Sequence, residues 1–463
     1  MADRTAALDA AAAHARRFLD GLDERPVDAQ ADAAAVRAAL GGPLAERGED
    51  PAMVIDALVA GAEPGLVASA GPRYFGFVTG GALPAALAAD WLVSAWDQNT
   101  ALHVMSPAAA AIEEVAAAWL LDLLGLPATA SVGFVTGAQA ANTTGLAAAR
   151  HAVLARAGHD VERDGLTGAP RVHVVCGEQA HVTVHTALRL LGLGDATAHV
   201  VRVDDQGRMD ADALAATLAG LEPGPAIVVA QAGNVATGAF DPFEPIADAC
   251  AARGAWLHVD GAFGLWAAAN PATAHLTRGA ERADSWAVDA HKWLNVPYDG
   301  AMAIVADPAA HTAAMGMAAA YLVTDGGRRD GTSFVPESSR RARAIPVYAA
   351  LRQLGRAGVA ELVDRPCRHA RRMAQRLAAV DGATVLNDVV LNQVLVRFAG
   401  GDEANDAAVA AIQRDGTCWL GGSRWNGDAV LRISFSNWST TDADVDRAAD
   451  AIAAAAGRQA VAS

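Results

Sequence analysis

The chain is poor in cysteine. Only four of its 463 residues are cysteines, and no two are close enough in sequence to form a CxxC motif: Cys176, Cys250, Cys367 and Cys418. This wide spacing argues against a disulfide framework and against a zinc site built from thiolates. A reducing cytoplasm is the compartment that such a chain fits best.

Positive charge is also scarce, because 36 lysines and arginines face 52 aspartates and glutamates, which leaves a net charge of −16. An acidic chain repels nucleic acid phosphates and anionic membranes, so neither is an expected partner. No uncharged apolar stretch reaches the roughly 18 residues of a membrane span, and the charged N-terminal segment is unlike a signal peptide. With 52% hydrophobic residues, we expect a globular, cytoplasmic protein.

Three regions differ in their sequence pattern. Residues 1–74 have the spacing of helices with polar breaks, and we expect this segment to pack on a partner subunit because it cannot easily bury its apolar face alone. Residues 75–345 alternate short apolar runs with helical stretches, which predicts a large α/β domain with a mostly parallel sheet. Residues 346–463 indicate a smaller C-terminal α/β domain.

The apolar runs predict the strands of both domains. In the large domain they fall at 132–137, 171–177, 199–203, 226–233, 255–261, 285–290 and 301–306, and in the small one at 392–398 and 429–437. Ligands of such sheets bind beyond the carboxyl ends of the strands, where several polar residues of this chain lie. A stretch rich in Gly, Arg, Ser and Asp at 321–344 predicts a long loop, which is usually functional or disordered.

Lys292 follows the apolar run SWAVDA and begins the bulky segment KWLNVPY. Most lysines are ordinary surface residues. A lysine at the end of a buried strand is partly desolvated, however, and its amine then becomes a nucleophile that condenses with carbonyl cofactors. The neighbourhood of Lys292 favours this second interpretation.

Three other features have both a plain and a functional interpretation. Asp260 ends the run WLHVD and either forms a turn before Gly261 or pairs with the ring nitrogen of pyridoxal phosphate. His181 follows a strand and either starts a helix or stacks on a cofactor ring. The segment TGAQAANTT (136–144) opens a helix, so its backbone N–H groups could face a phosphate, although many strand–helix turns have this composition.

Taken together and in this order, these features resemble the pyridoxal-phosphate-dependent group II amino acid decarboxylases, which include aromatic-L-amino-acid and glutamate decarboxylases. The matching segments are GPRYFGFVTGG (71–81), TGAQAANTTGLAAAR (136–150), EQAHVTVHTALRLLGLG (178–194), GAFDPFEPIADACAARGAWLHVDGAFG (238–264), ADSWAVDAHKWLNVPYDGAMAI (283–304) and AAYLV (319–323). The resemblance implies fold type I, the aspartate-aminotransferase-like α/β fold. It also implies pyridoxal 5′-phosphate as cofactor, and we expect no metal. The helical N-terminal segment and the long loop lead us to expect a homodimer with active sites at its interface.

The resemblance also implies roles for single residues. Lys292 would bind the cofactor aldehyde covalently, Asp260 would pair with the pyridinium nitrogen and His181 would stack on the ring. Tyr321 matches the tyrosine of a mobile loop that helps to protonate the substrate carbon. The remaining candidates for the cofactor site are Ala138, Gln139, Asn234, His258, Asp289 and His291.

Two positions, Asp289 and Val235, depart from the pattern of the relatives. Asp289 stands where relatives often carry Asn near the phosphate. Val235 stands where they carry a hydroxyl residue that helps to position the stacking histidine, and Asn234 could substitute for it.

The predicted reaction is decarboxylation of an L-amino acid to its amine and CO2. An aromatic substrate is favoured because the 71–81 block is apolar, and the candidate pocket residues are Phe75, Phe77, Val78, Trp96, Gln98 and Asn99. Arg73, Gln98 and Asn99 leave an acidic or other polar substrate open.

Three rival interpretations remain. One is another enzyme of the same fold, such as an aminotransferase, a lyase or an aldehyde synthase, although Tyr321 disfavours the last of these. A metal hydrolase built from His258, Asp260 and His291 lacks any HExxH-like spacing. A non-catalytic oligomer conflicts with the intact set of Lys292, Asp260 and His181.

Overall fold

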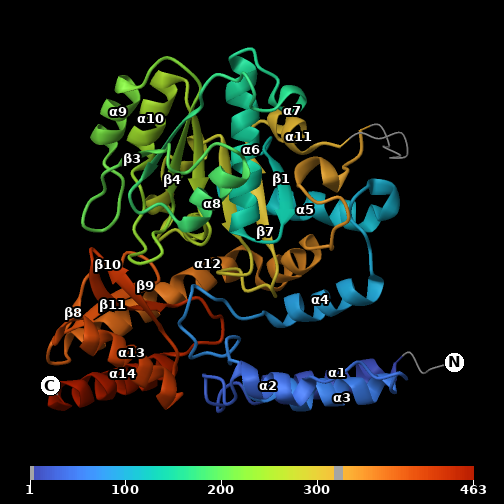
Figure 1. Cartoon of the computed structure of the whole chain (residues 1–463), viewed down its shortest axis with the longest axis vertical. Helices are drawn as coiled ribbons and strands as arrows, with labels where there is room; N and C mark the ends of the chain where they lie inside the picture. The colour runs from blue at the N-terminus through green and yellow to red at the C-terminus, as the bar shows by residue number, and fades with distance from the viewer. Residues whose placement is uncertain (1–4, 318–326, 463) are drawn as a thin grey trace. The chain divides into compact units, whose positions relative to one another are not determined.

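The computed structural model describes residues 5–317 and 327–462, with side chains up to Gly457. It divides into two compact units (Figure 1). The larger unit comprises Gly80–Arg371 and Leu386–Val394, and the smaller one comprises the chain up to Thr79, Arg372–Val385 and the chain from Leu395 onward. The N-terminal helices and most of the predicted C-terminal region therefore belong to one unit.

A seven-stranded sheet forms the centre of the larger unit, with the strand order β1-β7-β6-β5-β4-β2-β3. The strands from β2 to β6 pair in parallel, whereas β7 runs antiparallel to β1 and β6, so the predicted mostly parallel sheet is confirmed. Their bounds are β1 Ser131–Val135, β2 His173–Gly177, β3 His199–Val201, β4 Ala226–Gln231, β5 Trp256–Asp260, β6 Ser285–Asp289 and β7 Ala301–Val305.

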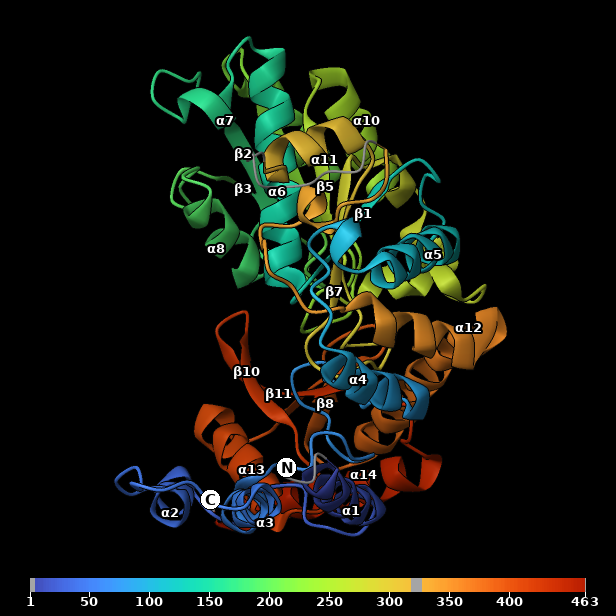
Figure 2. The same ribbon diagram turned by 90° about the vertical axis from the view of Figure 1, so that its right-hand side faces the viewer.

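Helices flank this sheet. In Figures 1 and 2, α6 lies along the sheet, where it contacts the strands from β4 to β7, and β4 also contacts α10. The helices are α4 Pro84–Trp96, α5 Pro107–Leu123, α6 Ala138–Arg156, α7 Val161–Asp164, α8 Val182–Leu190, α9 Ala211–Gly220, α10 Phe243–Arg253, α11 Pro308–Met315 and most of α12 Ala344–Ala378. Short 3-10 segments occur at His103–Met105, Gly264–Ala269, Ala274–Thr277, Ala280–Arg282 and Gly331–Phe334.

Burial explains why the strands read as unbroken apolar runs. Every residue of β1, β5, β6 and β7 is buried, as expected for strands that are covered on both faces. The helix α6 approaches the sheet closely because a glycine faces it: a Cβ atom on Gly145 would lie 2.8 Å from Cε1 of His258. The sequence therefore brings α6 within reach of polar side chains on β5.

The smaller unit contains three N-terminal helices and a four-stranded sheet. The helices are α1 Ala6–Asp20, α2 Ala33–Leu40 and α3 Pro51–Ala62, followed by the 3-10 turn Glu63–Gly65. The sheet has the order β10-β11-β9-β8, with β8 Ala383–Val385, β9 Gln393–Phe398, β10 Gly421–Trp425 and β11 Asp428–Ser434, and the unit also contains α13 Gly401–Asp415 and α14 Asp442–Ala462. Among the described residues, none in α1 or α2 is buried.

The strand directions place the candidate residues of the larger unit along one edge. All of its strands except β7 point the same way, so their carboxyl ends meet at one side of the sheet. His181 follows β2, Asp260 ends β5 and Asp289 ends β6. In the described ranges, no helix combines the length and the apolar character needed to cross a membrane.

Candidate active site

Lys292 lies in the turn after β6, and its side chain is 20% exposed. Its Nζ is 3.1 Å from Oδ2 of Asp289, so the ammonium group is paired with a buried carboxylate. Lys292 is also the only lysine in the chain, since the other 35 of the 36 lysine and arginine residues are arginines. One side-chain amine is therefore available to condense with a carbonyl, and it lies at the carboxyl edge of the sheet.

Asp289 connects this amine to the start of α6. Its Oδ1 accepts a hydrogen bond from the backbone N–H of Ala138 at 2.6 Å, and Nε2 of His291 lies 3.5 Å from the same oxygen. Burial lowers the pKa of His291, whose Nδ1 accepts the Gly300 N–H at 3.2 Å. The predicted residues Ala138, Asp289, His291 and Lys292 thus form one cluster at the end of β6.

Asp260 is 5% exposed at the end of β5. Its Oδ1 accepts the Ala262 N–H and its Oδ2 accepts a hydrogen from Nδ2 of Asn142, both at 3.2 Å. The carboxylate therefore has further acceptor capacity for a cationic N–H. The backbone N–H of Asp289 donates to Ala262 O at 2.8 Å, which joins the ends of β5 and β6.

His181 is the N-cap residue of α8 and is half-buried. Its Nδ1 lies 2.8 Å from Oγ1 of Thr183 and accepts the Thr183 backbone N–H at 3.4 Å. These contacts hold the ring at the start of α8, so His181 does start a helix. Stacking of the imidazole on a cofactor ring stays a prediction.

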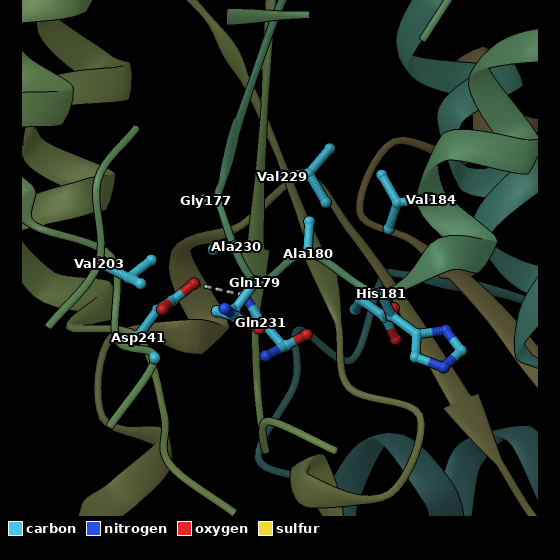
Figure 3. Close-up of a pocket in the computed structure, with 12 residues that line it drawn as sticks. Gly177, Gln179, Ala180, His181, Val184, Val203, Val229, Ala230, Gln231 and Asp241 are labelled. Carbon is cyan, nitrogen blue, oxygen red and sulfur yellow. Dashed lines mark hydrogen bonds between the residues drawn. The ribbon is translucent and has the colours of Figure 1, made fainter. Parts of the chain in front are cut away.

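A small pocket beside His181 is shown in Figure 3. Its lining includes Gln179, His181, Gln231, Asp241 and Asp260. The carboxylate of Asp241 accepts the backbone N–H of Gln231 at 2.7 Å, which is the dashed line of the figure. Burial raises the pKa of Asp241 to about 6. The pocket thus combines amide and carboxylate groups next to the two predicted cofactor residues.

Three predicted cofactor residues are engaged by nearby protein groups. His258 is fully buried, with Nδ1 2.8 Å from Ser285 Oγ and Nε2 2.9 Å from Asn142 Oδ1. The Asn234 side-chain oxygen accepts the backbone N–H groups of Ala236 and Thr237, so it closes its own turn. Gln139 donates to Thr143 Oγ1 at 3.4 Å within α6.

The other candidates are distributed over both units or lie outside the description. Phe75, Phe77 and Val78 belong to the smaller unit, whereas Trp96, Gln98 and Asn99 belong to the larger one. Tyr321 lies outside the described residues.

Sequence reasoning missed Asn142, Thr183, Ser285 and Trp256 as parts of the site. Asn142 stands inside the quoted segment TGAQAANTT, one turn after Ala138, and is fully buried. The sequence does not distinguish Asn142 from its polar neighbours Gln139 and Thr143, because its partners come from α8 and β5.

The chemistry of these groups fits pyridoxal 5′-phosphate. Its aldehyde needs an amine, which Lys292 offers, and its ring nitrogen needs a carboxylate, which Asp260 offers. The N-terminus of the 19-residue helix α6 is suited to an anion, because its first N–H groups have no partners within the helix and Gly137 has no side chain to cap them. Among residues 5–317 and 327–462, no group of three or more His, Cys, Asp and Glu side chains could hold a metal ion.

Comparison with known sequences gives the same result. Residues 40–399 match the family described as the pyridoxal-dependent decarboxylase conserved domain. L-2,4-diaminobutyrate decarboxylase of Rhizobium meliloti (strain 1021) is 30% identical over 380 residues, which cover 79% of this chain and 74% of the relative. Aromatic-L-amino-acid decarboxylase of Bacillus atrophaeus is 26% identical over 440 residues, which cover 91% and 89%.

Solved structures share the fold. The crystal structure of Oryza sativa TDC with PLP and tryptamine superposes with a TM-score of 0.90 at 24% identity, over 98% of this chain and 97% of the other. The crystal structure of mouse CSAD superposes with a TM-score of 0.88 at 21% identity, over 98% and 99%. The predicted fold class, fold type I, is therefore confirmed.

The predicted family, enzyme class and cofactor are confirmed as well, because the family match spans most of the chain and the relatives are decarboxylases of amino acids. The chain belongs to the pyridoxal-dependent decarboxylases, and it is a carboxy-lyase that uses pyridoxal 5′-phosphate to decarboxylate an amino acid.

Proposed function

We propose that this protein decarboxylates an aromatic L-amino acid to the corresponding amine and CO2, as a cytoplasmic homodimer. The observation that carries the substrate class is the conformation of Phe77. Its side chain is 62% exposed, and it is followed by Val78, with φ of 53° at Phe77 and 58° at Val78.

Two successive non-glycine residues in the left-handed region are strained, and for a β-branched valine the conformation is a genuine outlier. Such strain persists only where the surrounding structure imposes it, and it gathers at binding and active sites. Val78 itself is fully buried, so packing holds the turn while Phe77 points outward. This arrangement supports a role for Phe77 in contacting substrate.

Phe77 belongs to a small aromatic cluster within the smaller unit. Its ring centroid lies 5.4 Å from that of Trp419, on which Tyr74 stacks at 5.0 Å. Gly76 makes room for this cluster, because a Cβ atom there would lie 2.2 Å from the Trp419 ring. An aromatic side chain gains about 0.5–1.5 kcal/mol from ring contacts of this type beyond the area it buries.

The nearby arginine is not available for an acidic substrate. Arg73 is 1% exposed, and its guanidinium donates to Thr417 O at 2.5 Å and Asp23 O at 2.8 Å. Gln98 likewise donates to Trp96 O, and the Asn99 oxygen accepts backbone N–H groups. These polar groups are occupied by the protein itself, which supports an apolar substrate side chain.

The roles of the site residues follow from their chemistry. When bound, pyridoxal phosphate acts as an electron sink for the bond that releases CO2. Lys292 would hold its aldehyde, Asp260 its ring nitrogen, His181 its ring face, and the first turn of α6 with His291 its phosphate. Tyr321 would deliver a proton to the substrate carbon.

A diamino acid is the second candidate substrate. The relative with 30% identity is an L-2,4-diaminobutyrate decarboxylase, which is a higher identity than the 26% of the aromatic-L-amino-acid decarboxylase. Within the smaller unit, the exposed aromatic side chain of Phe77 could also face a cation, because aromatic ring faces attract ammonium groups.

Exposed apolar side chains support the homodimer. In the smaller unit they include Leu8 at 63%, Met53 at 60% and Leu58 at 50% exposure, and in the larger unit Trp91 at 45% and Trp96 at 50%. Leu8 of α1 and Met53 and Leu58 of α3 lie on two helices that contact each other, and clustered apolar surface often marks an interface. Size-exclusion chromatography with light scattering, and an activity assay on each eluted fraction, tests the homodimer. A monomer with full activity would contradict it.

A panel of L-amino acids, with CO2 and amine both quantified, tests the substrate class. We expect the highest kcat/KM for an aromatic member, at least tenfold above L-2,4-diaminobutyrate and L-glutamate. A highest value for L-2,4-diaminobutyrate would select the second candidate. Release of keto acid in place of CO2 would overturn the reaction itself.

A further inference from the structure

Buried polar side chains connect Trp256 to Asp260 through a series of hydrogen bonds. The indole Nε1–H of Trp256 donates to Ser285 Oγ at 2.8 Å. An indole nitrogen can only donate, so Ser285 accepts this bond and its own hydroxyl hydrogen must point elsewhere. Nδ1 of His258 lies 2.8 Å from the same oxygen.

The Asn142 amide decides the direction of this contact. A carboxylate can only accept, so Asn142 turns its Nδ2 toward Asp260 Oδ2 and its oxygen toward Nε2 of His258. Full burial keeps this imidazole neutral, since it lowers the pKa of His258 to about 4. The ring therefore carries its one proton on Nε2, which donates to Asn142 Oδ1 at 2.9 Å, and its Nδ1 accepts the Ser285 hydroxyl hydrogen.

The orientation of the Asn142 amide is thereby fixed. Its oxygen faces His258, so its two N–H bonds face Oδ2 of Asp260 and Oγ1 of Thr183, each at 3.2 Å. His181 Nδ1 accepts the Thr183 backbone N–H, so the Thr183 hydroxyl, which accepts from Asn142, donates its hydrogen to the same Nδ1 at 2.8 Å. Asn142 is fully buried and uses both donors and its acceptor.

We propose that Trp256, Ser285, His258 and Asn142 form a one-directional hydrogen-bond chain that orients Asp260 and His181 together, with Asn142 as the positioning residue at its branch. Each hydrogen bond of the chain is donated in the direction of Asp260 and His181, so Asp260 is held as a carboxylate that accepts. His181 is held with Nδ1 as an acceptor, which leaves its proton on Nε2. This proposal rests on the roles proposed above for Asp260 and His181.

The main test replaces Asn142 by Asp. N142D has nearly the same shape, but it turns a carboxylate oxygen toward Asp260 where a donor stood. A hydrogen bond to a charged group contributes about 1.5–3 kcal/mol, so we expect the dissociation constant of pyridoxal 5′-phosphate, measured by titrating apoprotein, to rise by about tenfold or more. We also expect kcat to fall more than KM rises. Binding within twofold of the wild type in a folded N142D protein would overturn the proposal.

A matched pair of tryptophan variants covers the case in which N142D does not fold. W256F removes the first donor of the chain, whereas W286F removes a buried indole whose Nε1–H donates to Ala280 O at 2.8 Å, outside the chain. We expect W256F to weaken cofactor binding at least threefold and W286F to leave it within twofold. Equal effects of W256F and W286F would mean a merely structural role and would overturn the proposal.

The tautomer of His258 gives a readout that needs no cofactor. In apoprotein labelled with 15N-histidine, we expect the Nε2–H form of His258 in the wild type and in W286F. N142A removes the acceptor of the Nε2–H group, so a second tautomer should appear in this variant. A wild-type His258 with its proton on Nδ1 would overturn the chain. A loss of activity in D260A or H181A tests the proposed roles separately, and retention of activity there with the expected tautomers would reject those roles alone.

Discussion

Lys292 Nζ lies 3.1 Å from Asp289 Oδ2, and the other oxygen of the same carboxylate accepts the Ala138 N–H at 2.6 Å. One buried carboxylate therefore serves both the only side-chain amine of the protein and the first turn of α6. A negative charge at a helix N-terminus is favourable. The Asp289 carboxylate also lies where we propose that the cofactor phosphate binds. The two anions would therefore compete for the first turn of α6.

The first prediction concerns this competition. D289N keeps an oxygen that can accept the Ala138 N–H but removes the negative charge. Two like charges a few ångströms apart repel, and the nearby ammonium group of Lys292 offsets part of this repulsion. We expect D289N to bind pyridoxal 5′-phosphate about fivefold more tightly than the wild type, measured by titration of the apoprotein.

The matched control is D289A, which removes both the charge and the acceptor for Ala138. It should bind the cofactor less tightly than D289N, because the start of α6 loses its partner. Weaker binding by D289N than by the wild type would mean that the carboxylate supports the cofactor and would contradict this prediction.

The second prediction uses the absence of other lysines. Reductive methylation modifies amines, so in this chain it can act on Lys292 and the N-terminal amine alone. We expect mass spectrometry of the digested apoprotein to find the modified side chain at Lys292, and saturating pyridoxal 5′-phosphate to protect it. Borohydride treatment of the loaded protein should fix the cofactor mass on the same peptide, and its recovery on the N-terminal peptide would contradict the assignment.

Much of this site could be predicted from the sequence because its members leave local signals. Lys292, Asp260 and His181 each follow or end a buried strand, and a polar residue there is visible without the fold. Asn142 leaves no comparable signal, since its partners Thr183, His258 and Asp260 lie on other elements. Trp256 and Ser285 belong to buried strands and resemble core residues in the sequence.

Some features of the fold could be predicted from the sequence and others could not. The strand at 301–306 was predicted, but its antiparallel direction depends on the connection, which runs from Asp289 to Ala301 without a crossover helix. A parallel neighbour would need such a crossover. The strands β8 and β10 were missed, because β8 has three residues and β10 begins with two glycines.

The third prediction concerns a buried ion cluster of the larger unit. Glu113 is 2% exposed, with Oε1 2.6 Å from Arg340 Nη1 and Oε2 2.9 Å from Arg329 Nε. The Arg340 side chain is completely buried. Removing the carboxylate leaves this guanidinium uncompensated, which costs about 3–5 kcal/mol. We expect E113A to lose that much free energy of unfolding in urea denaturation.

The exposed pair between Asp122 and Arg356 gives the comparison. Their side chains are 69% and 62% exposed, and exposed pairs contribute little. D122A should change the free energy of unfolding by no more than about 0.5 kcal/mol. If E113A and D122A had equal effects, burial would not govern the contribution of the Glu113 cluster.

The fourth prediction concerns acid stability and His311. This ring is fully buried against Ser131 Oγ at 2.8 Å and Phe334 O at 3.0 Å, and burial lowers its pKa from 6.5 to about 4. Between these values the unfolded chain binds a proton that the folded protein does not, so stability is complete above pH 6.5 and falls on acidification toward pH 4.

The shift at His311 corresponds to at most about 3 kcal/mol over this range. In H311Q the titrating group is absent, so the free energy of unfolding should fall less steeply with acidification, by up to about 1.4 kcal/mol per pH unit. Urea denaturation at pH 7, 6 and 5 measures the slope, and H275Q, at an exposed position, is the matched control. The titration of His311 changes the slope of the free energy of unfolding against pH. Packing lost in H311Q lowers that free energy equally at every pH, so it does not change the slope. Parallel curves for the wild type and H311Q would mean that His311 becomes protonated in the folded protein as readily as in the unfolded chain.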